Sequence, residues 1–186
     1  MKQQVGKLAR NPAVLISLVA GFGLLRPCPS RAADQSLEYQ VKAAFLLNFT
    51  KFIEWPPAAF AQTDSPIAIC IMGDDPPGST LDRMVAGEVV NGRKVVARRI
   101  RSEPTPHSCQ VVFVGGPEKD VPTVLASLGP GILTVGEGEA FVHDGGVIAF
   151  IIEERRVRFV INQAAAQRAG LKLSSKLLSV AKSVNK

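Results

Sequence analysis

The sequence predicts an α/β fold, a single layered domain with a mixed, largely parallel sheet flanked by helices. Short apolar runs of strand length alternate with helical segments along most of the chain, which is typical of parallel strands joined by helices. Several of these runs are apolar throughout, as expected for strands that are covered on both faces. A late pair of strands around a charged turn predicts the antiparallel part of the sheet.

Residues 1–32 have the features of a cleaved signal peptide. Three basic residues and no acidic residue precede an apolar run at 13–25, and the small-residue stretch Ser30-Arg31-Ala32-Ala33 follows it. The run has 13 residues, whereas a membrane-spanning helix needs about 20. We therefore expect cleavage near Ala33 and export to the periplasm, the alternative being an anchor that is retained.

The leader also explains most of the positive charge. It holds five of the 22 basic residues and none of the 16 acidic ones, so residues 33–186 carry 17 basic and 16 acidic residues, a net charge of +1. This balance gives no reason to expect binding to nucleic acid. The remaining length suffices for one domain with its own core. No second stretch reaches membrane length, so we expect no membrane insertion after cleavage.

The first expected element is a long amphipathic helix. Ser36 is placed to cap a helix that begins at Leu37, and apolar residues recur at spacings of three and four up to residue 53. Trp55-Pro56-Pro57 would end it. The apolar face either packs only on the core or also meets a partner, and both interpretations stay open.

The middle of the chain predicts a strand, a helix and a hairpin. Residues 67–72 form an apolar strand, and Ser79 is placed to cap a helix at 80–85. Asn91-Gly92 predicts a tight turn between strands at 88–90 and 94–100. Arg98, Arg99 and Arg101 are expected to lie on a solvated strand edge.

The remaining elements are predicted from apolar runs and from the capping, glycine and proline residues between them. Asn162 is placed to cap a helix and Gly170 to end it. Ser174 and Ser175 precede the last expected helix. In order, we expect strands at 109–114 and 132–135, helices at 118–128 and 138–143, a hairpin of strands 147–152 and 157–161, and helices at 164–169 and 176–184.

Two cysteines remain after removal of the leader, Cys70 and Cys109. Each lies in an apolar, strand-like run, and an even pair in an exported protein is typical of a disulfide. Such a bridge would stabilise the domain by about 3–4 kcal/mol in the chain-entropy model. The alternative is two separately buried thiols.

No motif predicts a catalytic, metal or cofactor site. The 73–79 turn lacks both nucleotide-binding patterns, so turn geometry explains it better than phosphate binding. The acidic pairs Asp74/Asp75 and Glu153/Glu154 are expected to be solvated. Glu139 suits the first turn of a helix, and His143 suits the last turn of the same helix.

Several strings, taken together, resemble the YfiR-like family of exported bacterial proteins. The resemblance extends over nearly all of residues 33–186. The strings are 38–56 (EYQVKAAFLLNFTKFIEWP), 69–76 (ICIMGDDP), Val89 with Asn91-Gly92-Arg93, 158–162 (RFVIN) and 169–178 (AGLKLSSKLL).

The resemblance implies a periplasmic regulator and not a catalyst. It implies a repressor that binds the periplasmic part of an inner-membrane diguanylate cyclase of the YfiN type and holds it inactive. Redox or envelope signals would release the enzyme, so that cyclic di-GMP and biofilm formation rise. Related domains form the sensing part of histidine kinases, and family members form homodimers.

Two sets of residues follow from the resemblance. Cys70 and Cys109 match a family disulfide, whereas residues 145–161 hold no cysteine for the second bridge of a better studied member. The string at 171–178 matches a segment implicated in function, so we expect Leu171, Leu173, Lys176 and Leu177 to bind the partner.

Two other functions remain open. One is an exported ligand-binding module that acts on a histidine kinase or a transporter, and it predicts a deep pocket with converging polar groups. The other is an exported hydrolase, which predicts a nucleophile and a base close together near Ser79, His143 or the strand ends.

Overall fold

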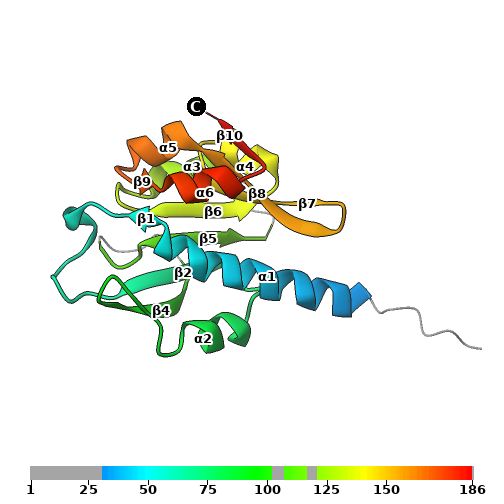
Figure 1. Ribbon diagram of the computed structural model, residues 1–186, viewed down its shortest axis with the longest axis horizontal. Coiled ribbons are helices and arrows are strands. Elements are labelled where there is room, and N and C mark those ends of the chain that lie inside the picture. The colour runs from blue at the N-terminus through cyan, green and yellow to red at the C-terminus, as the bar shows by residue number, and fades with distance from the viewer. Residues whose placement is uncertain (1–30, 102–106, 117–120, 186) are drawn as a thin grey trace, which may run out of the picture.

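An eight-stranded sheet forms the centre of the computed structural model, which describes residues 31–101, 107–116 and 121–185 (Figure 1). Its strands are β2 (Ile67–Gly73), β3 (Val89–Val90), β4 (Arg93–Ile100), β5 (Val111–Gly115), β6 (Leu133–Glu137), β7 (Ile148–Glu153), β8 (Arg156–Asn162) and β10 (Ser183–Asn185). They lie in the order β10-β8-β7-β6-β5-β2-β4-β3. The strands from β4 to β7 in this order are parallel to their neighbours. β3 is antiparallel to β4, β8 is antiparallel to β7, and β10 is parallel to β8. The predicted mixed, largely parallel sheet is confirmed.

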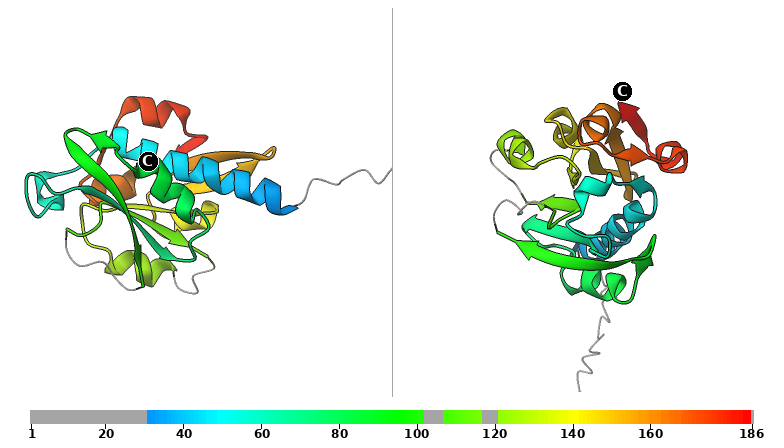
Figure 2. Two further views of the ribbon diagram at one scale, coloured as in Figure 1. Left: turned by 90° about the horizontal axis from the view of Figure 1, so that it is seen from below. Right: turned by 90° about the vertical axis from the view of Figure 1, so that its left-hand side faces the viewer.

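Helices cover both faces of this sheet (Figure 2). They are α1 (Arg31–Lys51), α2 (Ser79–Val85), α3 (Val121–Ser127), α4 (Glu139–His143), α5 (Gln163–Arg168) and α6 (Ser175–Val180). Residues of α1, α2 and α6 pack in one core cluster with one face of the sheet, and residues of α3 and α4 pack in a second cluster with the other face. None of the described helices has the length and apolar character of a membrane span.

The alternation of side chains along the strands creates the two clusters. In β2, Ile67, Ile69 and Ile71 point toward α1 and α2, whereas Cys70 and its neighbours of the same parity point toward α3 and α4. All of these side chains are buried. This explains why the strand is apolar at every position.

The first helix differs from the prediction at both ends. The helix already includes residues 31–36, so Ser36 is not its cap, and it ends at Lys51. It ends there because the following residues form β1 (Ile53–Glu54), which pairs with β9 (Lys172–Leu173) in a small second sheet. A short 3-10 helix, Pro57–Ala59, comes next.

Other boundaries also need correction. Ser79 is the first residue of α2, and Gly78, with a φ of 49°, takes the cap position. The last helix ends at Val180 and not at 184, because residues 183–185 pair with β8. The Asn162 and Ser174 caps are present, since their side chains accept hydrogen bonds from Ala165 N and Leu177 N. Residues 1–30 of the expected leader and 118–120 of the expected helix lie outside the described residues.

Candidate protein-interaction surface

A groove lies between the N-terminal half of α1 and the β7–β8 hairpin. We call it the hairpin groove. Its volume is about 590 Å³. It is lined by Leu37, Glu38, Val41, Phe45, Ile152, Arg155, Arg156 and Val157.

The hairpin groove exposes apolar side chains to solvent. Leu37 is 60% exposed, Ile152 52% and Val41 37%. Single exposed apolar residues are ordinary, but several that line one concavity are typical of an interaction site. The sequence analysis left open whether the apolar face of this helix meets a partner, and the N-terminal half of α1 now has a surface that could.

A second pocket, which we call the aromatic pocket, shares Phe45 with the hairpin groove. Its volume is about 280 Å³. The rings of two lining residues, Phe49 and Phe159, have centroids 5.2 Å apart. A third lining residue, Val180, is 57% exposed. It is lined by Phe45, Asn48, Phe49, Phe52, Phe159, Lys176, Leu177 and Val180.

Of the four predicted partner-binding residues, Lys176 and Leu177 line this aromatic pocket, and Leu171 and Leu173 do not. Leu171 and Leu177 are 4% and 3% exposed and belong to the core. Leu173 is half-buried, and Lys176 is exposed with its Nζ 5.5 Å from the centroid of the Phe52 ring. Leu173 and Lys176 are therefore the residues of this set that are accessible to a partner. The two buried leucines hold the segment against the core. Contact with a partner remains a prediction.

Lys42 ties the groove side of α1 to the sheet. Its side chain is 2% exposed, and its Nζ contacts a carboxylate oxygen of Glu38 and, at 2.9 Å, Oε1 of Glu137 at the end of β6. The Nζ also lies 4.5 Å from the centroid of the Tyr39 ring. Burial lowers the pKa of Lys42, but the hydrogen bonds and charges of the two glutamates outweigh it, and the pKa is raised above its ordinary value.

Replacing Lys42 with Met should destabilise the domain by about 1–3 kcal/mol near neutral pH, because two glutamates lose their partner while the apolar stem is kept. A raised pKa stabilises the fold while the amine is protonated, and this contribution disappears as the pH rises through the raised pKa. The difference between wild type and Lys42→Met should therefore shrink above about pH 10.5. Urea unfolding over a pH series measures it. Lys94→Met, at an exposed lysine, is the control, and a difference that stays constant over this range would contradict the assignment.

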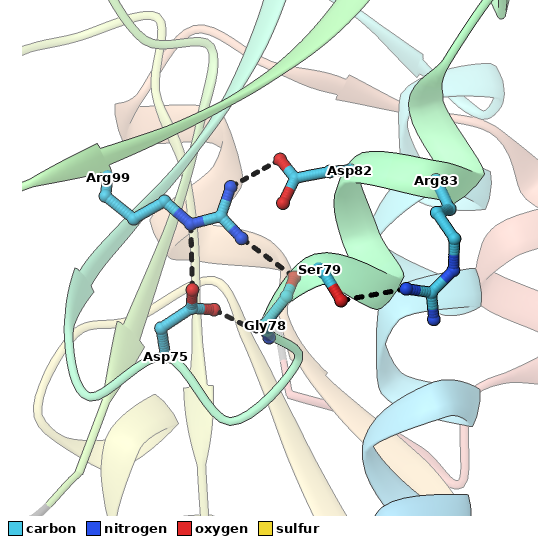
Figure 3. Close-up of polar contacts among 6 residues, drawn as sticks. All are labelled: Asp75, Gly78, Ser79, Asp82, Arg83 and Arg99. Atoms are coloured by element: carbon cyan, nitrogen blue, oxygen red, sulfur yellow. Dashed lines mark hydrogen bonds and ion pairs between the residues drawn. The ribbon is translucent and has the colours of Figure 1, made fainter.

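The acidic turn after β2 is held by an arginine of β4 (Figure 3). Arg99 donates from Nε to Asp75 Oδ2 at 2.8 Å, from Nη1 to Asp82 and from Nη2 to the Gly78 carbonyl at 2.8 Å. The hydrogen bond to Asp82 is the main reason that the pKa of Arg99 is raised. Arg99 and Asp75 are therefore paired with each other, while Arg99 remains exposed on β4 as expected. The turn interpretation of residues 73–79 agrees with this geometry.

Glu153 of the other acidic pair is also not simply solvated. Its carboxylate lies 2.9 Å from Lys182 Nζ, and this hydrogen bond raises the pKa of Lys182. Glu154, at the turn, is exposed.

The structure does not bring the candidate hydrolase residues together. Ser79 begins α2 and His143 ends α4, and these helices pack on opposite faces of the sheet. Ser79 Oγ instead accepts a hydrogen bond of 2.8 Å from Arg83 (Figure 3). Within the described residues, no group of three or more metal-ligating side chains is found.

Cys70 and Cys109 form a disulfide, with Cα atoms 5.9 Å apart. Cys70 lies in β2 and Cys109 two residues before β5, the strand beside it. Both cysteines belong to the cluster on the α3 and α4 face. The bridged alternative of the sequence analysis is therefore the observed one.

The hairpin groove and the pairing of Arg99 with Asp75 and Asp82 were not predicted from the sequence. The pair Glu38 and Lys42, four residues apart on one helix, was a readable signal for an ion pair. The link from Lys42 to Glu137 crosses 95 residues and leaves no local signal.

The profile of the YfiR/HmsC-like family matches residues 39–182. No curated protein is significantly similar to this chain. One similar solved structure is a conserved domain protein from Vibrio cholerae, with 12% identity and a TM-score of 0.43; the match covers 63% of this chain and 54% of that chain. Another is an ABC domain from Streptococcus pneumonia in complex with L-Trp, with 14% identity and a TM-score of 0.45; the match covers 79% of this chain and 60% of that chain. The chain thus spans less than two thirds of either.

Proposed function

The chain belongs to the YfiR/HmsC-like family, and from this premise we propose that it is a periplasmic repressor of an inner-membrane diguanylate cyclase. The family match, which extends over residues 39–182, is the observation that carries the proposal. In this proposal residues 1–32 are removed on export, and residues 33–186 act as a homodimer. The role is regulatory and not catalytic.

The repressor would act by binding one state of the cyclase better than the other. A binding protein shifts an equilibrium between two conformations only by its difference in affinity for them. A complex with the inactive arrangement of the periplasmic part would therefore lower cyclic di-GMP production. Exposed apolar surface beside α1 and α6 supports such an interaction, since Val41 and Val180 are 37% and 57% exposed.

The disulfide lies away from this surface, and this position restricts how a redox signal would act. Cys70 and Cys109 lie in the cluster of α3 and α4, whereas Phe45 and Val157, which line the hairpin groove, pack on the other cluster. Reduction would therefore weaken repression by lowering the stability of the domain, and not by changing a contact with the partner.

Deletion of the gene in the native bacterium should raise cyclic di-GMP, and the mature protein should capture a diguanylate cyclase from detergent-solubilised membranes. Lys176→Glu should weaken this capture about tenfold, because the charge of one exposed side chain in the interface is reversed. Lys94→Glu, an equal charge change at an exposed lysine of β4 outside both the aromatic pocket and the 171–178 segment, is the matched control.

Unchanged cyclic di-GMP after deletion, with no cyclase captured, would contradict the proposal. Capture of a histidine kinase or a transporter instead would assign the chain to a sensing module. Equal weakening by Lys176→Glu and Lys94→Glu would remove α6 from the contact surface while leaving repression intact.

A further inference from the structure

We infer that the hairpin groove is the docking site for an acidic amphipathic helix of a partner protein. The inference rests on the proposed function only for the partner's identity, the membrane diguanylate cyclase. The lining residues of the groove carry the chemistry of the helix that it would bind.

The floor of the hairpin groove is apolar and is long enough for a helix. Leu37, Val41 and Phe45 follow each other at intervals of four residues along α1, so they form one row about 12 Å long. Ile152 and Val157 of the hairpin face this row. A helix in such a groove contacts it through apolar residues at spacings of three, four and seven.

The charges around the groove favour an acidic occupant. Among the described lining residues, Arg155 and Arg156 are basic and Glu38 is acidic. Glu38 is paired with Lys42 and Arg155 already interacts within the protein, so Arg156 is the lining charge that a partner would meet. Glu153 is bound to Lys182, and neither acid of the hairpin turn lines the groove. Opposite charges at the edge of an interface select the partner and orient it.

A second copy of this chain fits the groove less well. A twofold-symmetric contact places the same surface against itself. It would place a concave surface against a concave surface, and it would bring the arginines of both hairpins into one interface. Like charges that face each other in an interface are unfavourable.

A membrane surface also fits poorly. The apolar side chains line a concavity between a helix and a hairpin, whereas a peripheral membrane site presents a protruding apolar face to the bilayer. An inserted protein segment can fill a concavity of about 590 Å³. An added strand would need free main-chain groups at a sheet edge, whereas the walls of this groove are side chains of α1 and the hairpin, so a helix suits it better.

Site-specific photocrosslinking in the native bacterium tests the inference with the full chain. We place benzoylphenylalanine at Val41, in the groove, and in a separate strain at Val89, which is 57% exposed on the opposite edge strand β3. Irradiation should give an adduct at position 41 and none of comparable yield at position 89. Mass spectrometry of the adduct should identify an acidic segment with helical apolar spacing.

Charge variants make the test specific. Arg156→Glu should lower the yield of the position-41 adduct about tenfold, and Arg156→Lys should keep most of it. Arg168→Glu, at an exposed arginine of α5 outside the groove, should leave the yield unchanged. The circular dichroism of each purified variant shows whether it is folded.

An adduct to a second copy, to lipid or to a segment without acidic residues would overturn the inference, and so would equal yields at positions 41 and 89. The proposed function fails separately. If deletion leaves cyclic di-GMP unchanged while position 41 crosslinks to an acidic helix of another protein, the groove assignment stands and the repressor function does not. If deletion raises cyclic di-GMP and position 41 gives no adduct, the repressor function stands and the groove assignment does not.

Discussion

Replacing Cys70 and Cys109 together with alanine should lower the free energy of unfolding by about 4 kcal/mol. The bridge closes a loop between residues 39 apart in sequence, and the unfolded chain gains conformational entropy when this loop opens. Alanine is preferable to serine because both sulfurs are buried, and a hydroxyl would need a hydrogen-bond partner. Thermal unfolding of protein purified from the periplasm should show a melting temperature lowered by about 10 °C.

A reductant gives the matched control for this prediction. It should lower the melting temperature of the wild type toward that of the double variant and leave the double variant unchanged. Equal melting temperatures of oxidised wild type and double variant would contradict a stabilising role. Cyclic di-GMP in cells that carry the double variant would then show whether stability and repression change together.

Replacing Phe49 with alanine should cost about 3–5 kcal/mol, the usual range for a large aromatic side chain in a core. Its side chain is 1% exposed. The ring stacks on Phe45 and Phe150, at centroid distances of 5.9 and 5.8 Å, and meets Phe159 edge-on. Because these rings join α1 to β7 and β8, the variant should also loosen the helix that forms one wall of the hairpin groove.

Urea unfolding measures the loss, and Phe49→Leu is the control. Leucine keeps most of the apolar volume, so it should cost clearly less than alanine. Hydrogen exchange should show faster exchange along α1 in Phe49→Ala than in the wild type. Equal stability of the alanine and leucine variants would mean that this ring is not central to the core.

Long apolar runs made most of the sheet predictable from the sequence. Residues 67–72 are apolar at every position, and Asn91-Gly92 specifies a tight turn, so β2 and the β3–β4 hairpin lie where they were expected. The short strands β1, β9 and β10 were not predicted. Each has only two or three residues, so its pairing depends on the tertiary structure and not on a local pattern.

The candidate site was less predictable, because its key contacts join distant segments. Lys42 is a basic residue on a helix, and only the fold shows that it is buried against Glu137. A side chain at Gly136 in β6 would meet the Phe141 ring at 2.3 Å, so packing requires glycine there, and no local pattern in the sequence shows this. Leu171 and Leu177 belong to the predicted interaction segment, yet both are buried.

The position of α1 determines the order in which the chain can fold. Ile53, just after α1, pairs with Leu173, and Phe49 of α1 packs on Phe159, so this part of the chain needs strands that are synthesised late. Contacts between residues so far apart in sequence form slowly. The disulfide links residues only 39 apart and can form much earlier. A chain that emerges N-terminus first therefore keeps Phe45 and Phe49 of α1 without these partners until β7 and β8 have emerged, and this helix is the part that a chaperone would protect.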